Sequence, residues 1–221
     1  MGIVSNEHRL RVIEVLQTLE KATRDMPEPM IFLLKKHFGP DSFIILIGCL
    51  LSLRAKDSVT YPLCLELFKI VRTPQQLLSL SREKLEKILY PLGFQRRKAA
   101  TLHTVCRELL DRFDGNVPCN EKALRSIRGI GHKTTALVLA EACDTPAICV
   151  DTHVHRLANQ LGLVQTKSTE ATEQELKKLV PQEKWVVVNR VFVTWGQQVP
   201  RKEQISKIIE LLNEKNVPCD S

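Results

Sequence analysis

Hydrophobic positions recur along most of the chain with the period of an α-helix. The first such segment is predicted over residues 6–24, with charged residues opposite its apolar face. That face is predicted to contain Leu10, Ile13, Val15, Leu16 and Leu19. The apolar run at 42–53 predicts a buried helix, because it is too short to span a bilayer. We therefore expect no membrane partner.

Capping residues and turns divide the rest of the chain into further helices. Thr73, Ser81 and Asn120 are predicted N-caps, and Pro62 fits only near the first turn of its helix. The segment 183–196 has strand-like valines, but its aromatic residues have helical spacing, which favours helix. The predicted helices lie at about 58–71, 82–89, 95–113, 121–127, 132–142, 152–161, 169–179, 183–196 and 201–215, with a short one opened by Pro74. This pattern predicts an all-α protein.

The charge and the cysteine content indicate which partners and which cellular compartment to expect. The net charge of +7 favours a polyanion, although solvated lysines are an equally good explanation of charge alone. The seven cysteines form no C-x-x-C pair, and several stand in apolar runs where a thiol behaves as a small buried side chain. The odd count and the lack of a secretory signal predict a reducing interior rather than a disulfide framework. We expect a cytoplasmic protein, associated with the nucleoid if bacterial.

The run GIG at 129–131 is the most informative turn in the sequence. Gly129 and Gly131 let the backbone turn tightly while Ile130 packs between two helices, so that the amides at the turn face a phosphate. An ordinary glycine corner between helices is the alternative explanation. The neighbouring Arg125, Arg128, His132 and Lys133 favour DNA. A phosphate contact of this kind positions a duplex without reading its sequence.

Lys133 and Asp151 are candidates for chemistry. Lys133 opens the helix after the turn, where the helix dipole disfavours a cation and a partly desolvated amine shifts toward its nucleophilic neutral form. Asp151 follows an apolar run and stands at or near a helix N-cap. Taken alone, Lys133 would be interpreted as a solvated surface lysine and Asp151 as a helix cap.

The sequence resembles the helix-hairpin-helix DNA glycosylases, and within them the endonuclease III branch. The resemblance runs from about residue 43 to residue 195. It rests on GIGHKT at 129–134 and on VDTH at 150–153, whose aspartate lies eighteen positions after the lysine. It is supported by LLSLRAKD at 50–57, by Gly93 and Phe94 with KA at 98–99, and by VP at 117–118.

The resemblance implies a base-excision DNA glycosylase with AP lyase activity. Lys133 would attack C1′ of a nucleotide flipped out of the duplex and form a Schiff base, and Asp151 would stabilise the cationic sugar. The partner would be double-stranded DNA containing a lesion. Residues assigned to DNA contact by motif and neighbouring charge are Gly129, Ile130, Gly131, His132, Arg128, His153, Arg54, Phe94, Arg96 and Arg97. The backbone carbonyls of Arg125, Ile127 and Ile130 are candidate ligands of a sodium or potassium ion.

Two positions depart from the family pattern near the DNA. Arg54 stands where a glutamine commonly fills the gap left by the flipped base, and it could contact the orphan base, since guanine offers acceptors; a phosphate contact is the alternative. Phe94 replaces an aliphatic wedge and could insert between bases, or else belong to the core. Arg96, Arg97 and Lys98 would lie over the DNA backbone or form a solvated charged run.

A third departure concerns the iron–sulfur cluster. The branch normally ends in a C-x6-C-x2-C-x5-C array, but Pro200 stands near the first cysteine position and only Cys219 follows. Because a cubane cluster needs four thiolates, we expect no cluster and no required cofactor. The helix predicted at 201–215 would pack in its place.

The resemblance also implies two helical domains. One is a barrel over 33–144, with the helix-hairpin-helix at about 121–142; the other joins 1–32 to 145–221, with the active site in the cleft between them. Oxidised pyrimidines are the leading substrate. The alternatives are another lesion (uracil or thymine opposite guanine, 8-oxoguanine or an alkylated purine) or a non-catalytic DNA-binding module, and the expected state is a monomer.

Overall fold

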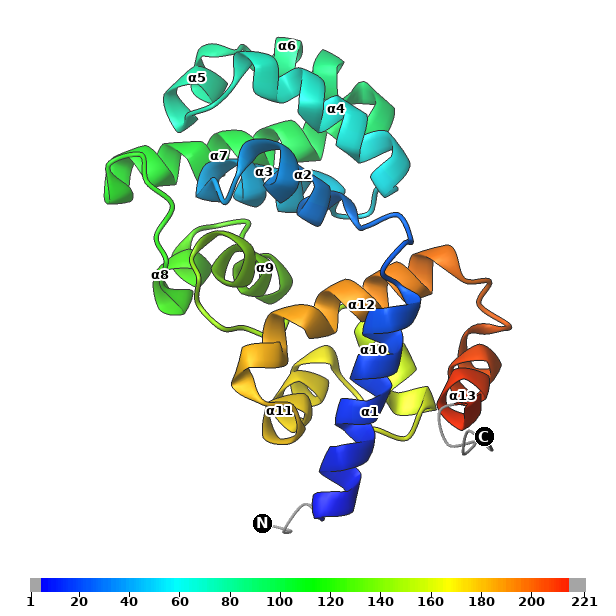
Figure 1. Cartoon of the computed structure of the whole chain (residues 1–221). Helices are drawn as coiled ribbons and strands as arrows, with labels where there is room; N and C mark the ends of the chain where they lie inside the picture. Colours follow the sequence, from blue (N-terminus) through cyan, green and yellow to red (C-terminus); the bar gives the residue numbers. More distant parts are fainter. Residues whose placement is uncertain (1–4, 215–221) are drawn as a thin grey trace. The chain divides into compact units, whose positions relative to one another are not determined.

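The computed structural model describes residues 5–214, and within that range it contains helices, turns and connecting segments but no strand (Figure 1). The predicted all-α class is confirmed. The chain divides into two compact units, residues 29–147 and residues 1–28 together with 148–221. It therefore passes from one unit to the other twice. Among the described residues no helix is long and apolar enough to cross a membrane.

The unit 29–147 is built around one buried helix. Its elements are α2 (Met30–Phe38), α3 (Ser42–Ser52), α4 (Asp57–Ile70), α5 (Pro74–Ser79), α6 (Arg82–Leu89), the 3-10 turn η1 (Tyr90–Leu92), α7 (Gln95–Phe113), α8 (Glu121–Ser126) and α9 (His132–Ala142). Every residue from 43 to 51 of α3 is buried, and α2, α4, α7 and α9 all pack against this helix. The side chain of Asp41 caps α3 by accepting the amides of Phe43 and Ile44.

The other unit joins one N-terminal helix to the helices that follow residue 148. Its elements are α1 (Asn6–Ala22), α10 (Thr152–Gln160), α11 (Thr169–Leu179), the 3-10 turn η2 (Gln182–Lys184), α12 (Trp185–Gln198) and α13 (Gln204–Glu214). Helix α1 packs against α11, α12 and α13, while α10 packs against α11 and α12 (Figure 1). The segment 185–198 is helical, which confirms that aromatic spacing outweighs the strand propensity of its valines.

Three local expectations need correction. Leu10 is 58% exposed instead of buried, because at 100° per residue it lies about 160° around the helix from Val12, which is in the core. Helix α2 was not predicted; it begins directly after Pro29 without a side-chain cap. Pro62 is the sixth residue of α4 and not in its first turn. Its missing N–H leaves α4 one intrahelical hydrogen bond short.

A disulfide joins Cys119, just before α8, to Cys143, the C-cap of α9. The two sulfurs are 2.07 Å apart and close a sequence interval of 24 residues around the hairpin. This corrects the expectation of a fully reduced chain. Cys49, Cys64, Cys106 and Cys149 are buried and take no part in this disulfide, and burial raises the pKa of Cys49, Cys64 and Cys106 to about 12.

Reduction of the Cys119–Cys143 disulfide is expected to lower the free energy of unfolding by about 3 kcal/mol, because the bond restricts the unfolded chain over that interval. Denaturant unfolding with and without a dithiol reductant measures the change. The double variant C119S/C143S should match the reduced protein and show no response to reductant. Equal stability of all three forms would contradict the expectation.

Candidate nucleic-acid interface and active site

The helix-hairpin-helix consists of α8, the turn 127–131 and α9. Gly129 adopts a φ of +103°, a conformation that residues with a Cβ rarely adopt. Ile130 is 6% exposed, and its amide donates to the carbonyl of Ile127 at 3.1 Å. Ile130 is thus buried, with an exposed glycine on either side of it, whereas its packing between the two helices stays a prediction.

The turn is held from outside by α7. Arg112 donates to the carbonyl of Ser126 at 3.2 Å and to its hydroxyl at 2.7 Å. The carboxylate of Glu108 accepts the backbone amide of Arg128 at 3.0 Å. Within residues 5–214, the amides of Gly129 and Gly131 have no hydrogen-bond acceptor. Two amides at the start of a helix are therefore available to a phosphate oxygen.

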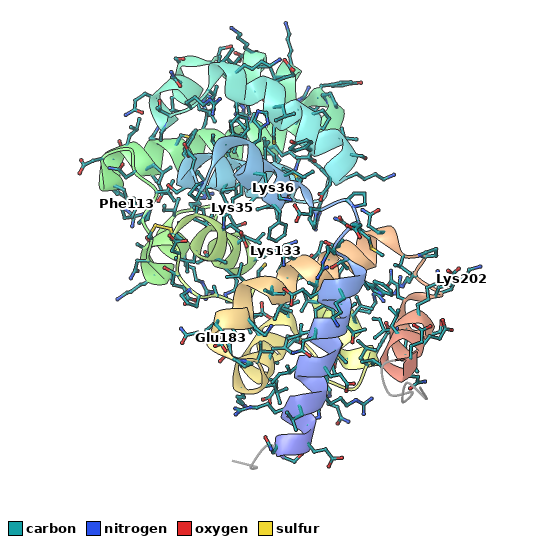
Figure 2. All side chains as sticks on the ribbon, in the orientation of Figure 1. Lys35, Lys36, Phe113, Lys133, Glu183 and Lys202 are labelled. Atoms are coloured by element: carbon teal, nitrogen blue, oxygen red, sulfur yellow. A yellow bond between two sulfur atoms is a disulfide. The ribbon has the colours of Figure 1, made fainter. Side chains whose placement is uncertain are left out.

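Lys133 lies in the first turn of α9 and is half-buried (Figure 2). Its positive charge lowers the pKa of the buried Cys49 thiol on α3. Burial has the larger effect and raises that pKa to about 12. The packing of α9 on α3 therefore places the start of α9, and this amine, within electrostatic reach of the most buried helix of the unit.

Asp151 is 8% exposed and is the N-cap of α10, as the sequence predicts. Its Oδ1 accepts the amides of His153 at 2.9 Å and of Val154 at 3.1 Å. Both bonds go to the same oxygen, so capping fixes the orientation of the carboxylate. Lys133 belongs to the unit 29–147 and Asp151 to the other unit. Their meeting at one site stays a prediction.

His153 packs closely against α12. A Cβ added to Gly196 would lie 2.1 Å from its Nδ1 and 2.8 Å from its Cγ, so only glycine leaves room for the ring. The position of this half-buried imidazole therefore depends on Gly196, a residue that the sequence did not single out.

Arg54, Phe94, Arg97 and Gly129 line one cavity of about 330 Å³ in the unit 29–147, together with Leu50, Leu53, Lys98, Thr101 and Leu102. Arg54 has a φ of +56° and Phe94 a φ of +50°, both left-handed. Phe94 is 61% exposed, so the core alternative for this residue is wrong. The structure thereby brings together the predicted gap filler, the predicted wedge and the hairpin glycine.

The remaining predicted basic contacts are on the surface. Arg96 pairs with Glu86 at 3.9 Å and Arg125 with Glu121 at 3.7 Å, and the arginine side chains are 85% and 53% exposed. Arg128 is also exposed. Exposed pairs of this kind contribute little energy, so these cations can exchange their partners for phosphates.

Lys98 differs from the other residues of the basic run 96–98. It is 8% exposed, and its ammonium donates to the carbonyls of Leu51 at 2.7 Å and Leu53 at 2.6 Å. It therefore neither faces a DNA backbone nor belongs to a solvated run, which corrects the sequence interpretation. Burial lowers the pKa of this lysine. Its helical position on the inner face of α7, with Leu102 and Val105, was the signal available in the sequence.

The chain matches the family described as HhH-GPD superfamily base excision DNA repair protein over residues 47–182. It belongs to this family. Within it, the chain is similar to endonuclease III of Thermotoga maritima, with 37% identity covering 75% of this chain and 78% of that protein. It is also similar to endonuclease III of Escherichia coli strain K12, with 35% identity covering 93% of this chain and 97% of that protein.

A solved structure of a non-covalent endonuclease III–DNA complex has the same fold, with a TM-score of 0.80 and 26% identity, covering 97% of this chain and 99% of that one. The structure of a trapped endonuclease III–DNA covalent intermediate gives a TM-score of 0.76 at 26% identity, covering 90% of this chain and 92% of that one. The family resemblance inferred from GIGHK and VDTH is confirmed.

One buried glutamine holds the segment between α12 and α13 in place through hydrogen bonds. Gln204 is 1% exposed and donates to the carbonyls of Gly196 at 3.1 Å and Val199 at 2.7 Å. Its side-chain oxygen accepts from Arg156 at 2.6 Å, and its main-chain carbonyl accepts the indole N–H of Trp195 at 3.1 Å. Across residues 5–214 no three His, Cys, Asp or Glu side chains are grouped as metal ligands; Cys219 lies outside the described residues.

The two hairpin glycines are expected to respond differently to alanine. In Gly129→Ala the new Cβ would lie 2.9 Å from Thr101 at a positive φ, so the free energy of unfolding should fall by about 1–3 kcal/mol. In Gly131→Ala the Cβ meets nothing within 4 Å, so stability should change by less than about 0.5 kcal/mol.

DNA affinity then tests the phosphate contact. Gly131→Ala should bind duplex DNA more weakly than the wild type while unfolding at the same denaturant concentration, because the added methyl group obstructs the approach of a phosphate to the turn. Unchanged affinity in this variant would show that no phosphate approaches the backbone there.

Proposed function

We propose that this protein is a base-excision DNA glycosylase with AP lyase activity that acts on lesions in double-stranded DNA. Family membership over residues 47–182 supports the class. The observation that supports the catalytic assignment is the position of Lys133, which is half-buried in the first turn of α9, directly after the glycine turn. Oxidised pyrimidines are the proposed substrates, and the proposed state is a monomer.

The proposed reaction begins with a nucleotide outside the helical stack, because its glycosidic bond is inaccessible within a duplex. The neutral amine of Lys133 attacks C1′, and the electrons of the glycosidic bond leave with the base, which takes up a proton. Ring opening gives a protonated imine between the lysine nitrogen and C1′. Loss of a C2′ proton then expels the 3′ phosphate by β-elimination, and water releases the lysine.

In this scheme Asp151 stabilises positive charge at the sugar. Capping of α10 by its Oδ1 holds the carboxylate in one orientation, and a pre-oriented charge stabilises a transition state without reorganising. Gly129 and Gly131 would hold a phosphate through their amides, and His132 and His153 would contact the strand beside them. A monovalent cation would be held at the turn by the carbonyls of Arg125, Ile127 and Ile130, since carbonyl oxygens suit hard cations.

Arg54 supports a second candidate substrate. It is exposed at a cavity that also contains Phe94, and a guanidinium matches the O6 and N7 acceptors of guanine. A protein that reads guanine as the orphan base would act on uracil or thymine opposite guanine. The chemistry at Lys133 would be the same.

Lys133→Gln is expected to abolish trapping by borohydride, since the amide nitrogen of glutamine cannot form the imine that borohydride reduces. The measurement is the covalent protein–DNA product on a panel of lesion duplexes. Asp151→Asn should slow base release roughly 10²-fold while keeping α10 capped, because asparagine caps as well as aspartate. Undiminished trapping by the lysine variant would remove Lys133 from the mechanism.

We also propose that the protein binds no iron–sulfur cluster. The donor set does not fit one: Pro200 stands near the first cysteine position, and one cysteine, Cys219, follows Cys149 in the sequence. A cubane cluster needs four thiolates. The segment between α12 and α13 is instead held in place by the hydrogen bonds of Gln204 to main-chain carbonyls.

Purified protein is therefore expected to lack stoichiometric iron and acid-labile sulfide, and to keep its activity and its unfolding midpoint after chelation. Elemental analysis and the chelated assay measure this. Four irons per chain, or loss of folding on chelation, would overturn the proposal.

A further inference from the structure

Lys98 is a buried cation that holds the end of a helix. Its ammonium donates to the carbonyls of Leu51 and Leu53, where α3 ends. Within residues 5–214 it forms no ion pair with a carboxylate. Burying a charge is unfavourable unless it is compensated, and here the compensation comes from carbonyl dipoles at the negative end of α3.

The bond to Leu53 acts directly on Arg54. The carbonyl of Leu53 and the amide nitrogen of Arg54 belong to the same rigid peptide plane. Fixing that carbonyl therefore fixes one side of the φ rotation of Arg54. This φ is +56°, a left-handed value that a residue with a Cβ keeps only where its surroundings impose it.

The same lysine also bonds to Phe94. Its backbone amide donates to the carbonyl of Phe94 at 2.9 Å, which opens α7 directly after that left-handed residue. Lys98 is thus hydrogen-bonded to the peptide before Arg54 through its side chain and to the peptide after Phe94 through its main chain. Arg54 and Phe94 line the same cavity, and both are exposed there.

We propose that Lys98 is a positioning residue that holds Arg54 in the left-handed conformation in which it reads the base opposite the lesion. This inference rests on the proposed roles of Arg54 and Phe94. If Lys98 only capped α3, its bond to the carbonyl of Leu51 would be sufficient. The second bond, to the peptide that enters Arg54, is the contact that couples Lys98 to recognition.

The test uses the full chain and duplexes that contain a tetrahydrofuran abasic-site analogue opposite guanine or opposite adenine. Such DNA has no base to release, so binding is measured without the chemistry of Lys133 and separately from borohydride trapping. Wild type should bind the guanine duplex about tenfold more tightly, the discrimination typical of one bidentate arginine–guanine contact. Arg54→Gln and Lys98→Met should each reduce this ratio to near one.

The double variant K98M/R54Q separates positioning from general destabilisation. If Lys98 acts through Arg54, adding Lys98→Met to Arg54→Gln should leave the ratio unchanged, as expected for two residues in one coupled unit. Leu109→Ala is the matched control: it removes a buried side chain from the same helix about 16 Å further along. It should lower thermal stability yet keep the wild-type ratio. If Lys98→Met does not fold, Lys98→Gln, which retains one donor group, is tested in its place.

Three outcomes overturn the proposal: an unchanged ratio in the Lys98 variant with both affinities reduced equally, a further change of the ratio in the double variant, or no effect of Arg54→Gln itself. Failure of the proposed glycosylase function would instead show as absence of trapping by the wild type on every lesion duplex. The two failures are therefore distinguishable.

Discussion

The burial of α3 is the constraint on which the unit 29–147 depends. Nine consecutive residues, 43–51, are excluded from solvent, so this helix requires a neighbour on every side, and α2, α4, α7 and α9 supply them. Because α9 packs on α3, the start of α9 and its lysine have a fixed place. Because α7 packs on α3, Lys98 reaches the carbonyls where α3 ends. Residues with quite different proposed roles are thus positioned by one apolar contact surface.

Much of this arrangement could be predicted from the sequence, because caps and periodicity are local signals. Helices 95–113, 132–142 and 169–179 have the predicted bounds, and Thr73, Ser81 and Asn120 cap as expected. Helix α2 was missed because it has no capping side chain and follows two prolines, Pro27 and Pro29, that indicate a break. Its formation is favoured by burial of residues 30–32 and 34, which is a tertiary effect.

The candidate site was predictable where a motif specifies it and not where packing does. The GIG turn and the capping role of Asp151 follow from local backbone chemistry, and both are seen. Gly196 beside His153 depends on the meeting of α10 with α12, which no local pattern reports. The same is true of Lys98: within a basic run it resembles its neighbours, and only the packing of α7 distinguishes it. The disulfide, too, joins cysteines that no spacing motif relates.

The Cys119–Cys143 bond makes the hairpin a covalently closed ring, with α8, the glycine turn and the whole of α9 inside it. One consequence concerns backbone cleavage. A protease cut at the exposed turn around Gly129 would divide the chain into two fragments that remain linked through the two sulfurs. Under oxidising conditions the nicked protein would gain only the mass of one water molecule, and the two fragments would separate only after reduction.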